Sequence, residues 1–170
     1  MPVSLYINRN GVYIMTTLQR KEYKDGTNYS GSWVLEYEEY DYPKDLEKVT
    51  GLIKQKLNPK YLTPKYREEN KTNPLHGHCY HSTQSLYYFF KNTNLTIMSG
   101  KCNLWGHHYW LEDADNNIID ITANQYHSIG KEPPYKNGKE VKRWYGWKGQ
   151  PLKRSLVLMN EVQPSSKLYK

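Results

Sequence analysis

The stretch HGHCYHSTQSLYYFF, residues 76–90, places a cysteine among three histidines and then becomes apolar and aromatic. The apolar residues recur at helical spacing, which predicts a helix from about residue 78 to residue 91. One face of this helix carries Cys79, Thr83, Leu86, Tyr87 and Phe90. Cys79 then lies in the first turn, where free N–H groups and the helix dipole favour the reactive thiolate. The pattern indicates a cysteine nucleophile, and its alternative is a small buried thiol without chemistry.

The histidines around Cys79 suggest a second kind of chemistry. His76, His78, Cys79 and His81, joined by His107 or His108, offer the nitrogen and sulfur ligands that zinc prefers. The cluster lacks the paired, closely spaced ligands on two chain segments that make zinc motifs specific. We therefore expect no metal or other cofactor, and we expect His76, His78 and His81 to be loop or surface residues.

The stretch GHHYWLEDADNNIIDITANQY, residues 106–126, supplies possible partners for the cysteine. It predicts a strand, a turn and a returning strand. If the residue numbers of paired positions sum to an even number, His108 and Asp120 share a face. With a three-residue turn at 113–115 they are directly opposed, with Cβ atoms about 5 Å apart. An odd sum aligns His107 with Asp120 instead, so periodicity leaves the base open between the two histidines. A thiol, an imidazole and an orienting carboxylate form the triad of nucleophilic acyl transfer.

This order of residues resembles the transglutaminase-like branch of the papain-like cysteine enzymes. The matching positions are Cys79 at the start of an apolar helix, His108 with Trp110 and Glu112, and Asp120 with Thr122. The resemblance covers residues 76–126, selects His108 as the base, and implies a helix bearing Cys packed against strands bearing His and Asp. The chain departs from the family where Tyr80 follows Cys79 and Ile121 separates Asp120 from Thr122. It also resembles small uncharacterised phage and bacterial proteins, which implies an accessory or host-directed role.

The resemblance implies acyl transfer from an amide or ester through a thioester on Cys79. Hydrolysis would make the protein a protease or deamidase, and transfer to an amine would make it an acyltransferase; both stay open. The side-chain donor to the oxyanion is open among His76, Gln55 and Trp33. We expect His76, Trp110, Thr122 and Gln125 to contact substrate or to support the triad. Cys102 has no such context and is expected to be a buried thiol.

The elements that position these residues predict one α+β domain over residues 1–170. Strands are expected within residues 3–17, around an Asn-Gly turn, and within 31–40, inside an N-terminal part that covers 1–42. Helices are expected within 43–91, one of them opening at Pro43, and the histidine and aspartate strands within 95–126. A loop or exposed hairpin and a closing helix that starts near Pro151 fill 127–170.

Composition limits the partners. The 170 residues carry a net charge of +7, which favours an acidic protein or nucleic acid as partner. No apolar run is long enough to span a membrane, and two cysteines cannot form a disulfide framework, so we expect a cytoplasmic protein. Basic and aromatic residues alternate at 139–148, which keeps a non-catalytic nucleic-acid-binding module as an alternative function. A degenerate papain-like fold that binds protein is a further alternative, and residues 133–149 are a candidate wall of the substrate groove.

Overall fold

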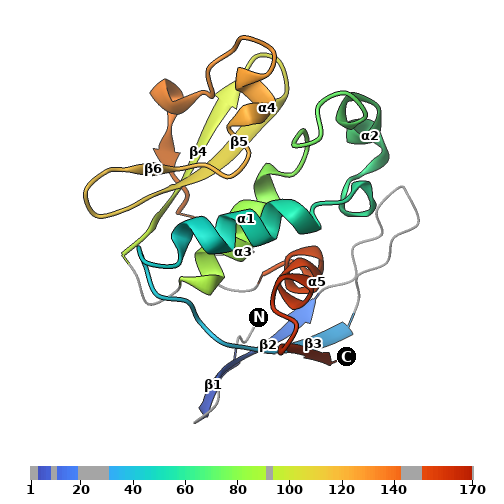
Figure 1. The fold of residues 1–170 in the computed structure, drawn as a ribbon, viewed down its shortest axis with the longest axis vertical. Helices are drawn as coiled ribbons and strands as arrows, with labels where there is room; N and C mark the ends of the chain where they lie inside the picture. Colours follow the sequence, from blue (N-terminus) through green and yellow to red (C-terminus); the bar gives the residue numbers. More distant parts are fainter. Residues whose placement is uncertain (1–3, 9–10, 19–30, 91–93, 143–150, 170) are drawn as a thin grey trace.

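The computed structural model describes residues 4–8, 11–18, 31–90, 94–142 and 151–169. Within these residues the chain forms two antiparallel four-stranded sheets with three longer helices between them (Figure 1). The predicted α+β class is therefore confirmed.

The first sheet has the strand order β1-β2-β3-β8. Its strands are β1 (Ser4–Asn8), β2 (Gly11–Leu18), β3 (Gly31–Tyr37) and β8 (Lys167–Tyr169). The strands expected within residues 3–17 and 31–40 are present, although Asn10 of the predicted Asn-Gly turn lies outside the described residues. Strand β8 was not expected; it pairs with β3, and Glu36 lies opposite Lys167.

The second sheet has the order β6-β5-β4-β7 and carries the candidate chemistry. Its strands are β4 (Thr96–Cys102), β5 (Gly106–Glu112), β6 (Ile118–Ile119) and β7 (Lys139–Glu140). β4 and β5 pair over their full lengths, from Thr96 opposite Glu112 to Cys102 opposite Gly106. This long hairpin holds β5 rigidly, and β5 bears both candidate histidine bases.

The helices are α1 (Leu46–Lys56), α2 (Pro64–Asn70), α3 (Cys79–Phe89), α4 (Asn124–His127) and α5 (Lys153–Val162), with short 3-10 turns at Pro59–Tyr61 and Tyr135–Asn137. The expected helices at 43–57, 78–91 and after Pro151 are all present with shorter limits. The first begins at Leu46 rather than at Pro43, because Asp41–Asp45 form a hydrogen-bonded turn ahead of it.

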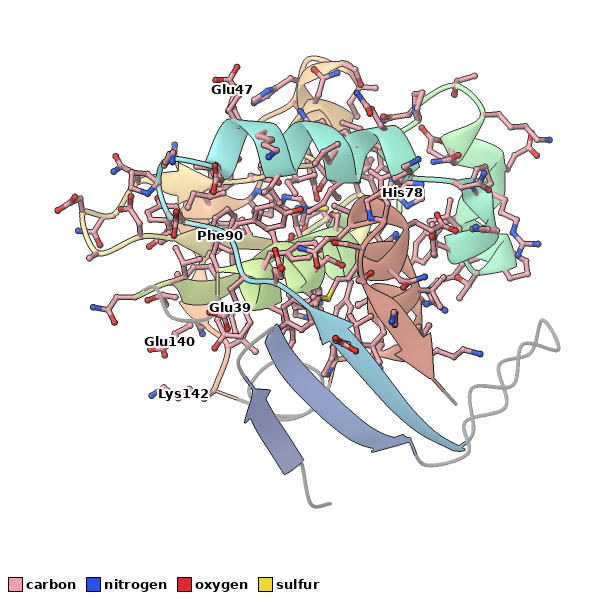
Figure 2. All side chains as sticks on the ribbon, turned by 60° about the horizontal axis from the view of Figure 1, so that its bottom comes forward. Glu39, Glu47, His78, Phe90, Glu140 and Lys142 are labelled. Carbon is pink, nitrogen blue, oxygen red and sulfur yellow. The ribbon has the colours of Figure 1, made fainter. Side chains whose placement is uncertain are left out.

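One hydrophobic cluster joins the helices to both sheets. Val49 and Ile53 of α1 are fully buried, as are Leu156 and Met159 of α5. Figure 2 shows side chains filling the space between the helices and the sheets, while Glu47 of α1 points outward. Burial of this apolar surface stabilises the domain and fixes α3, which lies at its centre.

Helix α3 is buried on nearly all sides, which explains its polar residues. The amide oxygen of Gln84 accepts hydrogen bonds from the backbone of Leu152 and the hydroxyl of Ser155, and Ser85 donates to the carbonyl of Ser155. Buried polar groups need such partners, so these contacts set the position of α5 against α3. Among the described residues, no helix has the length and apolar character needed to cross a membrane.

Candidate functional site

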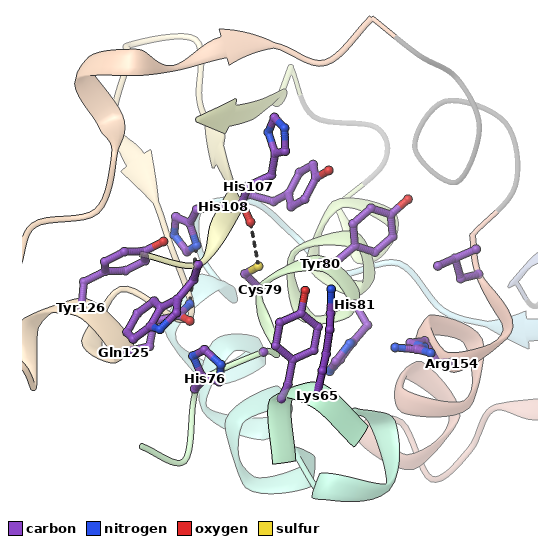
Figure 3. A pocket seen from close by; sticks show the side chains of 16 residues that line it. Lys65, His76, Cys79, Tyr80, His81, His107, His108, Gln125, Tyr126 and Arg154 are labelled. Atoms are coloured by element: carbon purple, nitrogen blue, oxygen red, sulfur yellow. Dashed lines mark hydrogen bonds between the residues drawn. The ribbon is translucent and has the colours of Figure 1, made fainter. Parts of the chain in front are cut away.

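Cys79 is the first residue of α3 and lies beside β5 (Figure 3). Its side chain is half-buried, and its sulfur is 4.0 Å from the carbonyl oxygen of His107. One turn further along α3, the hydroxyl of Thr83 donates to the carbonyl of Tyr109 at 3.2 Å, which ties the helix to the strand. The fold therefore places the thiol at the tip of a helix and against the strand that carries the candidate bases.

His108 and Asp120 are brought together by the hairpin of β5 and β6. The Nε2 atom of His108 donates to Oδ2 of Asp120 at 2.6 Å. Both side chains are almost completely buried, with exposed fractions of 1% and 2%. The paired residue numbers of β5 and β6 sum to an even number, and His108 and Asp120 lie close together as expected for that pairing. His107 lies on the opposite face of β5, where its side chain is exposed and 3.4 Å from the hydroxyl of Ser99.

The turn between the two strands differs from the expected one. Leu111 pairs with Ile119 and Glu112 with Ile118, so the loop spans residues 113–117 rather than 113–115. Asp113 closes this longer loop, because its carboxylate accepts hydrogen bonds from the backbone of Asp115 and Asn117. The prediction that His108 and Asp120 are directly opposed was wrong: the two extra loop residues leave them diagonal, and the side chains span that offset.

Asp120 is held by further hydrogen bonds from Thr122 and Tyr135. The backbone N–H of Thr122 donates to Oδ1 at 3.1 Å, which is the local turn that Asp-x-Thr forms. The hydroxyl of Tyr135 donates to Oδ2 at 2.8 Å. Tyr135 was not expected at this site, because it reaches the carboxylate from a 3-10 turn with no motif of its own. These donors stabilise the ionised carboxylate and fix its orientation.

The imidazole of His108 is enclosed by aromatic rings and an amide. The indole of Trp110 stacks on it with ring centroids 5.8 Å apart, and Tyr126 meets its edge at 4.9 Å. The amide nitrogen of Gln125 is 3.5 Å from Nδ1 of His108 and 3.0 Å from the hydroxyl of Thr122. Because Nε2 is bound to Asp120, Nδ1 is the ring nitrogen available on the side of Gln125 and the cleft.

The electrostatics of this arrangement favour a protonated imidazole. Burial alone lowers the pKa of His108, but the hydrogen bond to Asp120, the neighbouring Cys79 and the charges of both partners raise it to about 9. At neutral pH the ring then carries a proton on each nitrogen and can form an ion pair with a thiolate.

Two glycines make room for the indole beside His108. A Cβ atom on Gly138 would lie 2.6 Å from a ring carbon of Trp110, and one on Gly100 would lie 3.0 Å from another. Trp110 is fully buried, as is Thr122, and neither lines the cleft. Both residues therefore pack behind His108 and Asp120, away from the cleft.

A cleft of about 590 Å³ opens beside Cys79. His108, Gln125 and His76 line it, and Figure 3 shows the His76 ring between Gln125 and the start of α3. His76 is 3% exposed, and its Nδ1 atom has no hydrogen-bond partner within the described part of the chain. Burial lowers the pKa of His76, against a smaller opposing effect of Glu69, so the ring is neutral at pH 7. A neutral imidazole with an unused nitrogen can donate to a bound ligand.

His76 and His78 lie in the loop before α3, as expected, although both are buried. The expectation of a loop or surface position was wrong for His81, which is buried within α3. Nδ1 of His78 and Nε2 of His81 are 2.7 Å apart, so one neutral ring donates to the other. Burial lowers the pKa of His78 to about 4 and that of His81 well below its usual range, and the charge of Arg154 adds to both effects. Each ring of the pair thus has a hydrogen-bond partner in the other. Among the described residues, no three potential ligands are arranged to hold a metal.

Cys102 is half-buried rather than buried as expected. Its sulfur accepts hydrogen bonds from the hydroxyl of Tyr126 at 3.3 Å and from the backbone of Trp105 at 3.1 Å. Burial acts to raise the pKa of Cys102, but these hydrogen bonds, with those of neighbouring backbone amides, lower it overall. Any measurement of thiol reactivity in this protein must therefore separate Cys79 from Cys102.

The remaining candidates lie away from the cleft or outside the described side chains. Gln55 is exposed on α1 and does not line the cleft. The side chain of Trp33 and residues 143–150 fall outside what the structure describes, so the expected groove wall and the basic-aromatic stretch at 139–148 are described only up to residue 142. In that part, Lys136 and Lys139 line a neighbouring cleft rather than the one at Cys79.

In comparisons with protein-family models, curated proteins and solved structures, the chain matches none of them.

Proposed function

We propose that this protein is a cysteine-nucleophile acyl-transfer enzyme that uses Cys79, His108 and Asp120 as a catalytic triad. The observation that carries the proposal is the 2.6 Å hydrogen bond between His108 and Asp120 beside a helix-tip thiol. An imidazole whose pKa is raised to about 9 by the hydrogen bond to Asp120 and by the neighbouring Cys79 favours an ion pair between thiolate and imidazolium.

The geometry also supports the proposed kinship with the transglutaminase-like branch of the papain-like enzymes. The cysteine lies at the start of a helix that packs on the histidine strand, and the aspartate follows the next strand of the same sheet. The chain order Cys79, His108, Asp120 is that of the family. Under this proposal the second sheet and α3 together form the catalytic half of the protein.

The proposed reaction has two steps. In the first, the Cys79 thiolate attacks the carbonyl carbon of an amide or ester and forms a tetrahedral oxyanion. The bond to the leaving amine or alcohol then breaks, His108 gives that group a proton, and a thioester remains on Cys79. In the second step, neutral His108 takes a proton from water or an amine, which attacks the thioester and releases the thiolate. Asp120 holds the ring in the required orientation throughout.

The oxyanion needs two hydrogen-bond donors near the attacked carbonyl. We assign them to the backbone N–H of Cys79, in the first turn of α3, and to the ring of His76. His76 lines the same cleft, is neutral, and has an unused buried nitrogen. Tyr66 and Trp105 pack against its ring at centroid distances of 5.6 and 4.6 Å, so the donor is held in place.

A burst experiment with p-nitrophenyl acetate tests the proposal. We expect rapid release of one p-nitrophenolate per chain and, after acid quenching, an acetyl group that mass spectrometry maps to Cys79. The burst is lost in Cys79→Ala and retained in the matched control Cys102→Ala. A burst that survives Cys79→Ala, or an acetyl group on Cys102, refutes the assignment of the nucleophile.

A further inference from the structure

The cleft beside Cys79 is lined by positively charged side chains and by no carboxylate among the described residues. Its permanently charged side chains are Lys65 and Arg154. Figure 3 shows His108 and Gln125 on one side of Cys79 and both cations on the other. Positive charge is therefore concentrated on the side of the sulfur that the triad leaves open.

A second cleft, of about 740 Å³, lies next to the first, and His107 lines both clefts. Its charged residues are Lys101, Lys136 and Lys139, with Glu140 as the one carboxylate in its described lining. The carbonyl oxygen of His107 is 4.0 Å from the Cys79 sulfur, so the residue shared by the two clefts contacts the proposed nucleophile.

We propose that the substrate is an acidic peptide segment that crosses Cys79 with carboxylates on both sides of the attacked amide. This inference rests on the proposed acyl-transfer function. Carboxylates on one side would pair with Lys65 and Arg154, and those on the other with the three lysines of the second cleft. The length of two adjoining clefts fits an extended chain rather than a small amide.

The chemistry of the site favours a peptide over a nucleic acid as the anionic chain. A thiolate with an oriented imidazole attacks acyl carbon, and a peptide offers an amide carbonyl at every residue. Aromatic side chains of Tyr66, Tyr80 and Trp105 line the first cleft and give apolar contact to the stems of acidic side chains.

The test uses two alkylating probes that differ only in charge, N-iodoacetyl-glutamate amide and N-iodoacetyl-glutamine amide. Their second-order rate constants with Cys79 are measured in a Cys102→Ala background. We expect the acidic probe to react about fivefold faster, as for one exposed ion pair, and the ratio to fall with added salt. In Lys65→Gln/Arg154→Gln the ratio falls to about one, whereas the control Lys44→Gln, outside both clefts, keeps it.

A longer probe, iodoacetyl-Gly-Glu-Glu amide against its Gln counterpart, tests the second cleft in Lys101→Gln/Lys136→Gln, where the charge preference also falls. Ratios near one in the unmodified protein, or ratios that neither double variant changes, overturn the inference. So does tight, salt-dependent binding of a single-stranded oligonucleotide that blocks alkylation by both probes. The ratio is measurable even for an unactivated thiol, so slow alkylation of Cys79 by both probes refutes the proposed function instead.

Discussion

The substitution Asp120→Asn removes one charge from the centre of the site with little change of shape. The carboxylate accepts hydrogen bonds from His108 at 2.6 Å, Tyr135 at 2.8 Å and Thr122 at 3.1 Å. An asparagine retains an oxygen for one or two of these donors but leaves the buried imidazole without its counter-charge. The pKa of His108 should therefore fall from about 9 toward the 6.5 of a free histidine.

The size of the effect on stability follows from the two pKa values. The difference between 6.5 and about 9 corresponds to about 3 kcal/mol. Because the folded pKa lies above the unfolded one, this stabilisation is fully present below pH 6.5 and is lost as pH rises through 9. The free energy of unfolding should therefore decrease by about 3 kcal/mol from pH 6.5 to pH 9.5 in the unmodified protein, and much less in Asp120→Asn.

Two measurements check this prediction. An NMR titration of the Cε1–H resonance of His108 reports the ring's pKa directly, and urea unfolding at both pH values reports the linked stability. Asp115→Asn, the same change on an exposed loop carboxylate, is the control and should alter neither. An imidazole that titrates at the same pH in Asp120→Asn and in the unmodified protein would refute the reasoning.

Three further substitutions separate roles within the site. His76→Ala should lower the rate of acyl-enzyme formation by about 100-fold while leaving alkylation of the nucleophile, which forms no oxyanion, nearly unchanged; equal losses in both assays would argue for a structural role. Tyr135→Phe should lower the free energy of unfolding by about 1–2 kcal/mol, measured in urea, and an unchanged value would show that its hydrogen bond contributes nothing. Gly138→Ala places a methyl group 2.6 Å from a carbon of Trp110 and should cost about 1–3 kcal/mol. Gly51→Ala, with open space around it in α1, is the control and should be neutral or stabilising.

The local elements of this fold were predictable from the sequence. Helical spacing located α3 and the first turn that bears Cys79, and strand alternation with turn residues located the hairpin of β5 and β6. A pairing of β5 with β6 in which the residue numbers sum to an even number places His108 and Asp120 on the same face of the sheet. These features depend on short-range periodicity, which one sequence reveals.

Most of the features that were missed depend on contacts between separate elements of the chain. Burial of His78 and His81 follows from the packing of α1 and α5 around α3, which no local pattern records. The pairing of β8 with β3 joins residues more than a hundred positions apart. The hydrogen bond of Tyr135 to Asp120 similarly depends on where a loop returns to the second sheet. The turn after β5 was predicted too short because Asp113 closes a longer loop.

The central claim is that His108 activates the thiol of Cys79. It is tested most directly by the pH dependence of alkylation of Cys79 by iodoacetamide, followed by mass spectrometry in a Cys102→Ala background. We expect Cys79 to react at pH 6 much faster than a free thiol, and we expect His108→Ala to abolish this advantage. A rate at pH 6 equal to that of a free thiol, or one unchanged in His108→Ala, would contradict it.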